Sequence, residues 1–201
     1  MAPRRGVARA ALAALASMAI AAPAHAHGDA NLGDFYQGLL QPLYHLEFLL
    51  AALALALFST HQEPRASLTM CASFAAGVAF GSASSLLGVG GEGSLWGPRL
   101  CMLGVGPMVA LRLRVPAIVA MALGAVAGIA QGHAATQGEL AQIARPVLWT
   151  LGLAVGAGLL GAWANAVTDR FRAFWVQVGV RIAGSWIAAL GLLASVLALR
   201  R

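Results

Sequence analysis

Long apolar stretches separated by short polar or proline-containing segments make up most of the chain after its first thirty residues. A helix needs about 20 apolar residues to cross a hydrocarbon core of about 30 Å. The pattern therefore predicts six membrane-spanning helices, of which the third is short and interrupted by Gly104, Gly106 and Pro107. The expected spans are 34–58, 67–89, 100–111, 115–134, 147–167 and 174–199.

The composition also indicates a membrane protein built from helices. Hydrophobic residues make up 60% of the chain and charged residues only 10%, whereas soluble domains carry about 25% charged residues. Most of the chain should lie in lipid, as an all-α polytopic bundle forming a single domain over 27–201. All 13 basic residues are arginine and give a net charge of +6. They are scattered at the ends of the apolar stretches, which indicates membrane topology and excludes nucleic acid as a partner.

Residues 1–26 have the form of a secretory signal peptide. A basic start, an apolar run over 10–22 and the small-x-small site Ala24-His25-Ala26 follow one another. The alternative is a retained first helix. Cleavage would leave His27 at a new N-terminus, where it could chelate a metal or simply be solvated.

Orientation follows from cleavage of this signal, which would put the mature N-terminus on the periplasmic side of a bacterial inner membrane. Arg65, Arg112 and Arg114 then fall in cytoplasmic loops, as the positive-inside rule expects, while Arg200 and Arg201 would lie outside, against it.

Glycines recur at four-residue spacing in three of the expected spans. Small residues at this spacing let helix backbones approach closely in lipid. The pattern predicts tight helix packing at three sets of glycines: 77 and 81; 124, 128 and 132; 152 and 156.

The first span contains polar residues beside a proline. Gln41 and His45 are four residues apart and share a helix face, whereas Glu47 lies roughly 200° round the helix from His45. Pro42 has no N–H to donate to the carbonyl of Gly38 and disfavours straight continuation of the helix. Broken helices that expose polar groups are how many transporters build cation sites.

The fourth span supplies a second pair of polar residues, Gln131 and His133, at a similar expected depth. The segments Gly38-x-x-Gln41 and Gly128-x-x-Gln131 resemble each other, which raises the alternative of an inverted repeat. Imidazole suits nickel, cobalt, copper and zinc, and carboxylate or amide oxygens can complete such a set. The predicted metal site comprises His45, Glu47, Gln41, Gln131 and His133, with no tightly bound cofactor.

Structural roles compete with this site. Glu47 could form an ion pair with Arg181 of the sixth span, because the two differ by only about 6 Å in expected depth. His133 could cap a helix end. Cys71 and Cys101 are expected near opposite membrane faces, too far apart for a disulfide. Four aromatic residues are expected to anchor the helices at the membrane interfaces: Tyr36, Trp96, Trp149 and Trp175.

The segment 41–48, Gln-Pro-Leu-Tyr-His-Leu-Glu-Phe, is similar to the first-span motif His-Pro-x-x-Gly-x-Asp-His of the HupE/UreJ family of hydrogenase and urease accessory membrane proteins. The proline and the acid match in place. Gln41 and Phe48 stand at the histidine positions, and His45 stands at the glycine position. Segments 131–132, 137–139 and 181–189 also resemble the family's later His-Gly and arginine–glycine patterns. The resemblance implies a six-span fold and nickel transport, with the replaced histidines weakening the second implication.

Two hypotheses follow. One is a nickel- or cobalt-type divalent cation permease that supports metalloenzyme maturation; the other is a non-transporting accessory or scaffold that has lost its metal site. An enzyme is not expected, since no cofactor motif is present. The expected partners are membrane lipid, a Ni²⁺ or Co²⁺ ion as cargo, metalloenzyme maturation proteins and a second copy of the chain.

Overall fold

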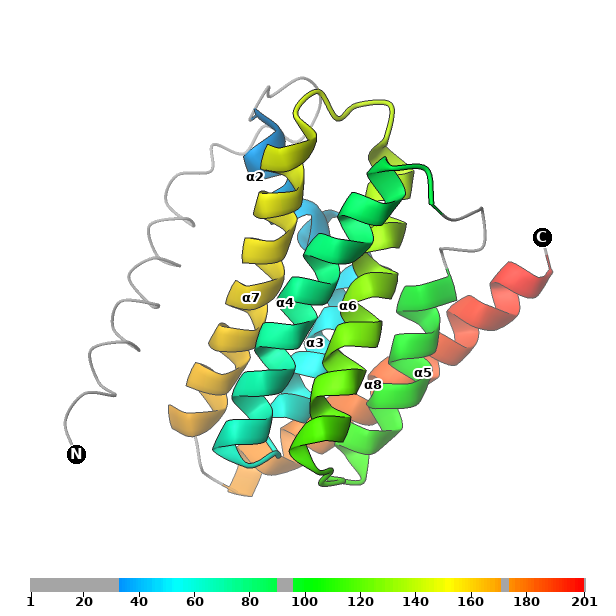
Figure 1. Ribbon diagram of the computed structural model, residues 1–201. Helices are drawn as coiled ribbons and strands as arrows, with labels where there is room; N and C mark the ends of the chain where they lie inside the picture. The colour runs from blue at the N-terminus through cyan, green and yellow to red at the C-terminus, as the bar shows by residue number, and fades with distance from the viewer. Residues whose placement is uncertain (1–32, 90–95, 171–173, 201) are drawn as a thin grey trace, which may run out of the picture. The chain divides into compact units, whose positions relative to one another are not determined.

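The computed structural model describes residues 33–89, 96–170 and 174–200, with only the backbone for 168–170 (Figure 1). The chain divides into two units, 1–33 and 34–201, and the helices below belong to the second apart from Gly33. The signal peptide expected at 1–26 lies outside the described residues, as does His27.

The described part of the chain is entirely helical and contains no strand, so the all-α prediction is confirmed. The last helix has the bounds predicted from the sequence, and the others begin or end within a few residues of the expected positions, except where the first span divides. The helices are α2 (Gly33–Tyr44), α3 (Leu46–Ser59), α4 (Pro64–Leu86), α5 (Trp96–Ala110), α6 (Ala117–Glu139), α7 (Pro146–Arg170) and α8 (Phe174–Leu199).

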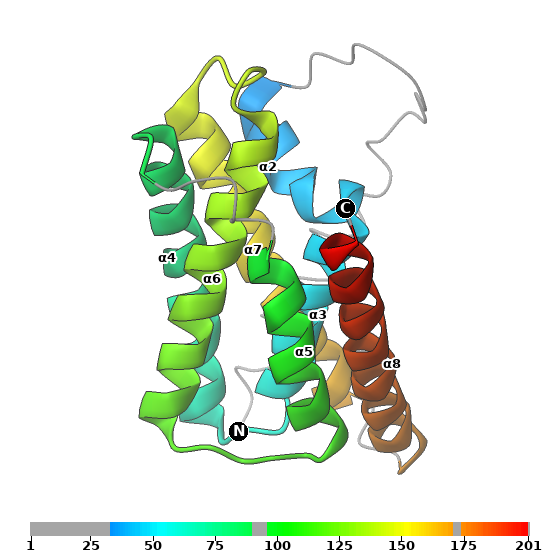
Figure 2. The same ribbon diagram turned by 90° about the vertical axis from the view of Figure 1, so that its right-hand side faces the viewer.

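Helix α3 occupies the middle of the bundle and contacts the other five long helices, α4 to α8. Its inward residues Ala51, Ala54 and Phe58 are fully buried. Figures 1 and 2 show α4 and α6 rising together beside α3, while α5 and α7 run in the opposite direction and α8 lies along the outer side of α5. The bundle therefore has two ends, one with the loop between α3 and α4 and the other with the loop between α6 and α7.

Four of the helices, α4, α6, α7 and α8, are long and apolar enough to span a membrane, with 22 to 26 residues in each qualifying segment. Counting α2 and α3 as one broken span gives five. At 15 residues, α5 is shorter than the 20 or so that a full crossing takes. The fold is that of a multi-pass membrane bundle, and the short helix α5 corresponds to the third expected span, 100–111.

The glycine spacing is explained by direct contact between helix backbones. On α4 and α6, a side chain at Gly81 would collide with the backbone of Ile129, and one at Gly128 would collide with the backbone of Phe74. Helices α2 and α7 meet in the same way, with Gly152 against Phe35. The predicted role of the three glycine sets in close packing is confirmed.

Candidate functional site

The first span is broken at His45, which separates α2 from α3. The two helices meet at an angle of 82°. His45 has φ −119° and ψ 113°, an extended conformation, while its carbonyl accepts the first hydrogen bond of α3 from the N–H of Leu49 at 3.0 Å. Pro42 lies in the last turn of α2. The first span thus turns sharply where the sequence predicted a distortion. Helix α6, the other member of the suggested inverted repeat, is unbroken from Ala117 to Glu139.

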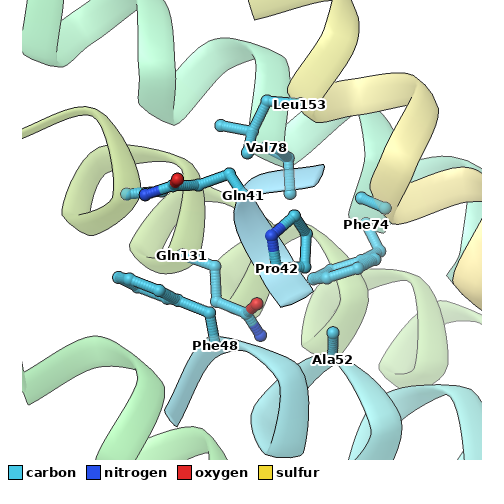
Figure 3. Close-up of a pocket in the computed structure, with 10 residues that line it drawn as sticks. Gln41, Pro42, Phe48, Ala52, Phe74, Val78, Gln131 and Leu153 are labelled. Atoms are coloured by element: carbon cyan, nitrogen blue, oxygen red, sulfur yellow. The ribbon is translucent and has the colours of Figure 1, made fainter. Parts of the chain in front are cut away.

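A small cavity lies inside this bend. Gln41 and Pro42 from α2, Phe48 from α3 and Gln131 from α6 line it together with six apolar neighbours (Figure 3). Its volume is about 20 Å³, enough for one water-sized particle. The structure therefore brings together two of the five predicted site residues, Gln41 and Gln131, although their amide groups point in different directions (Figure 3).

The side-chain amide of Gln131 is incompletely hydrogen-bonded. Its Nε2 is fully buried and has no hydrogen-bond partner within the described ranges. The Cys101 thiol lies beside the same side chain and also donates to the carbonyl of Ala51 at 3.7 Å. A buried amide donor without a partner costs about 1–3 kcal/mol, so the fold carries an unfavourable polar group at the broken helix.

His45 does not line this cavity. Its side chain is 48% exposed, and its Nε2 lies 3.6 Å from Oε1 of Glu139 at the end of α6. The carboxylate of Glu139 is 23% exposed. An imidazole and a carboxylate at this separation can share one divalent cation or one proton.

Glu47 pairs with a different arginine from the one predicted. Nε of Arg99 donates to its carboxylate at 3.0 Å, and Nη2 of Arg99 donates at 3.3 Å. Arg181 instead donates from Nε to the carbonyl of Ala110 at 3.0 Å. The expected Glu47–Arg181 pair is wrong because the break at His45 puts Glu47 in the first turn of α3, at one end of α5. Arg181 contacts the other end of α5, about 16 Å away along the helix.

His133 is separate again. Its Nδ1 lies 3.4 Å from Oγ of Ser84 on α4. The alternative of a helix cap does not hold, because α6 continues to Glu139. The five predicted site residues are thus divided among four places: the cavity with Gln41 and Gln131, and three separate contacts made by His45, Glu47 and His133. Across residues 33–89, 96–170 and 174–200, no group of three or more His, Cys, Asp and Glu side chains is arranged to hold a metal ion.

Two polar partners were not identified from the sequence as site residues: Arg99 with Glu47, and Glu139 with His45. A buried network was also missed. Trp149 Nε1 donates to Thr136 Oγ1 at 3.1 Å, Thr136 donates to Ser82 Oγ at 2.8 Å, and Ser82 is 3.0 Å from the Thr150 hydroxyl. Trp149 is only 2% exposed, so its predicted role as an interface anchor is wrong.

Together, the apolar helices and the broken first span define the class of a multi-pass membrane protein. The family model described as HupE / UreJ protein matches residues 10–194, nearly the whole chain. The protein therefore belongs to the HupE/UreJ family, whose members are accessory membrane proteins of nickel or cobalt metabolism. Comparison with curated proteins gave no match, and comparison with solved structures gave none.

Proposed function

We propose that this protein is a permease for a nickel- or cobalt-type divalent cation, located in the bacterial inner membrane and supplying metal for metalloenzyme maturation. The observation that carries the proposal is the 82° break in the first span, with Gln41 and Gln131 both lining a cavity at the bend. An interrupted helix that exposes polar groups within a bundle is a common basis for cation sites in transporters.

In this proposal, His45 and Glu139 capture the ion at the outer mouth. They lie 3.6 Å apart and remain partly exposed. Nitrogen and oxygen ligands of this kind suit nickel and cobalt, and two of them bind less tightly than a closed four-ligand site. Loose capture is what a transporter needs, because the ion has to be released.

The ion then passes the cavity between Gln41 and Gln131. Amide oxygens can coordinate a cation without a charge that would trap it. A volume of about 20 Å³ accepts a single water or a bare ion but not a hydrated ion. The described conformation is therefore the closed state of the proposed path, and widening of the bend at His45 would open it.

The predicted ligands Glu47 and His133 have smaller roles in this scheme. Glu47 holds α3 against α5 through Arg99, and His133 contacts Ser84. The mature N-terminus is proposed to be periplasmic, which puts the described arginines Arg65, Arg112 and Arg114 on the cytoplasmic side.

The test is nickel and cobalt accumulation in cells that express the wild type, His45→Ala, Glu139→Gln or the control Glu63→Gln. Glu63 is an exposed carboxylate at the opposite end of the bundle. At equal protein levels, the first two variants should lower accumulation roughly tenfold or more, because losing even a residue that supports a metal ligand typically costs about 10–100-fold. The control should match the wild type. Equal accumulation by all four would rule out this capture site.

A non-transporting accessory or scaffold is the second candidate. The pairing of Glu47 with Arg99 favours it, as does the lack of a three-ligand metal group in the described part of the chain. In that case wild-type cells would accumulate no more metal than cells carrying an empty vector, while deletion of the gene would still impair metalloenzyme maturation at high external metal.

A further inference from the structure

Helix α5 ends in an unusual version of a common helix stop. The N–H of Arg112 donates to the carbonyl of Val109, and the N–H of Leu113 donates to the carbonyl of Met108, both at 3.0 Å. This pair of bonds is the Schellman motif, which needs a left-handed residue at the position of Arg112. Arg112 has φ +53°, the only positive φ at a non-glycine residue among the described residues.

The same motif ends α4 with the residue usually found there. Gly88 has φ +74° and donates to Ser85, while Val89 donates to Ser84, both at 3.0 Å. Glycine adopts this conformation without steric penalty, whereas a residue with a Cβ does not. Within one chain, the end of α4 has the favourable residue and the end of α5 has an arginine. A role for the arginine side chain would explain this choice.

The segment that carries Arg112 is held firmly against the end of α3. The buried Gln62 donates from Nε2 to the carbonyls of Leu113 at 3.0 Å and Phe58 at 3.4 Å, and its Oε1 accepts from the N–H of Val115 at 3.0 Å. One side chain therefore ties the α5–α6 connection to α3. Arg112 and Arg114 are presented from a fixed backbone.

These arginines line a polar pocket of about 500 Å³ together with Thr60, His61 and Gln62. Neither arginine forms an ion pair with any residue that the structure describes. Nε2 of His61 is buried and has no hydrogen-bond partner in the same residues. Burial, followed by the charges of Arg112 and Arg114, lowers the pKa of His61 below its ordinary value. The pocket thus has a positive potential.

The ends of α3 and α5 oppose this potential only in part. A helix C-terminus is equivalent to about half a negative charge, so two of them balance about one of the two guanidinium groups. The neighbouring carboxylate Glu63 is exposed and does not line the pocket. A net positive charge remains to attract an anion.

We propose that this pocket binds a phosphate group, supplied either by an anionic lipid headgroup or by a soluble phosphate. Guanidinium groups hold phosphate through paired, charge-assisted hydrogen bonds, and basic pockets between membrane helices bind phospholipid headgroups. Arg112 and Arg114 supply the charge, and Gln62 fixes the segment that carries them. The site is at the end of the bundle opposite His45 and is independent of the metal path.

The test compares the wild type with Arg112→Gly and with the control Arg65→Gln. Glycine suits φ +53°, so Arg112→Gly removes the guanidinium while keeping or improving the backbone of the motif. Arg65 lies at the same end of the bundle but outside the pocket. Arg114→Gln is the second variant, in case Arg112→Gly is poorly expressed. Full-length protein is placed in phosphatidylcholine nanodiscs with or without phosphatidylglycerol.

Two measurements distinguish the sources of the phosphate. Native mass spectrometry reports retained phosphatidylglycerol, and calorimetry in pure phosphatidylcholine discs reports binding of inorganic phosphate. Arg112→Gly should weaken either phosphatidylglycerol retention or phosphate binding roughly tenfold, since a hydrogen bond to a charged group is lost. Arg65→Gln should leave both kinds of binding unchanged. Loss of lipid retention assigns the headgroup, and loss of phosphate binding assigns the soluble anion. Equal binding by all variants, or equal weakening by Arg65→Gln, would overturn the proposal and leave the arginines with roles in topology and helix capping alone.

Discussion

Glu47 in the first turn of α3 accepts two hydrogen bonds from Arg99 in the first turn of α5, at 3.0 and 3.3 Å. The guanidinium of Arg99 also lies 5.7 Å from the centre of the Trp96 ring. Both side chains are partly covered, with 17% of Arg99 and 39% of Glu47 exposed. The pair joins the broken first span to the short fifth helix directly after the bend.

Arg99→Gln should therefore lower thermal stability in detergent by the equivalent of about 1–2 kcal/mol, between the values for exposed and buried pairs. Glu47→Gln should have a similar effect, and the double variant should lose less than the sum of the two. Nickel accumulation by Glu47→Gln, at equal protein level, should stay near that of the wild type. A selective loss of accumulation in Glu47→Gln but not in Arg99→Gln would return Glu47 to the metal ligands.

Much of the fold follows from apolar run length. Because α8 is a predominantly apolar stretch between polar ends, its bounds were predicted to the residue. The glycine contacts were predictable as well, since spacing by four puts small residues on one helix face. The position of Trp149 was not predictable, because a tryptophan near the end of a span can face lipid headgroups or, as here, a buried threonine.

The site was less predictable because it depends on one angle. Pro42 indicated a distortion, but the size and place of the bend decide which side chains meet. The bend of 82° at His45 lets Gln41 and Gln131 line the same cavity. It places His45 beside Glu139 and Glu47 beside Arg99. A straight helix would have put Glu47 nearer the depth of Arg181, which is how the wrong partner was inferred.

Helix contact at Gly128 predicts a large effect from a single methyl group. In Gly128→Ala the new Cβ would press on the backbone of Phe74 and Val78, and overpacking of this kind typically costs about 1–3 kcal/mol. Gly138→Ala on the same helix is the matched control, because nothing lies within 4 Å of its Cβ position. The control should be neutral or stabilising, as alanine favours helix. Equal melting temperatures for the two variants would contradict the close backbone contact between α4 and α6.

Gln131 offers a test that separates function from stability. Gln131→Leu removes a buried unpaired donor and should raise thermal stability by about 1 kcal/mol or more. If the amide lines the proposed ion path, the same variant should lose metal accumulation. Gln62→Leu is the control for the substitution: it breaks three hydrogen bonds and should be destabilising. A stabilised Gln131→Leu that still accumulates metal like the wild type would remove this residue from the path.

The surroundings of His61 predict a pH dependence of stability that can be measured directly. Its pKa should lie below the ordinary 6.5 because the ring is partly buried and faces Arg112 and Arg114. Arg114→Gln should raise that pKa in an NMR titration in phosphate-free phosphatidylcholine discs. The folded state disfavours the charged ring, so the contribution of His61 to stability is complete above about pH 6.5 and is lost as the pH falls from there to the lowered pKa. His61→Gln should therefore flatten the decrease in melting temperature between about pH 7 and pH 5.5. A His61 pKa at or above 6.5, or the same decrease in both proteins, would contradict the lowered pKa of His61. An unchanged His61 pKa in Arg114→Gln would show that this arginine does not act on the ring.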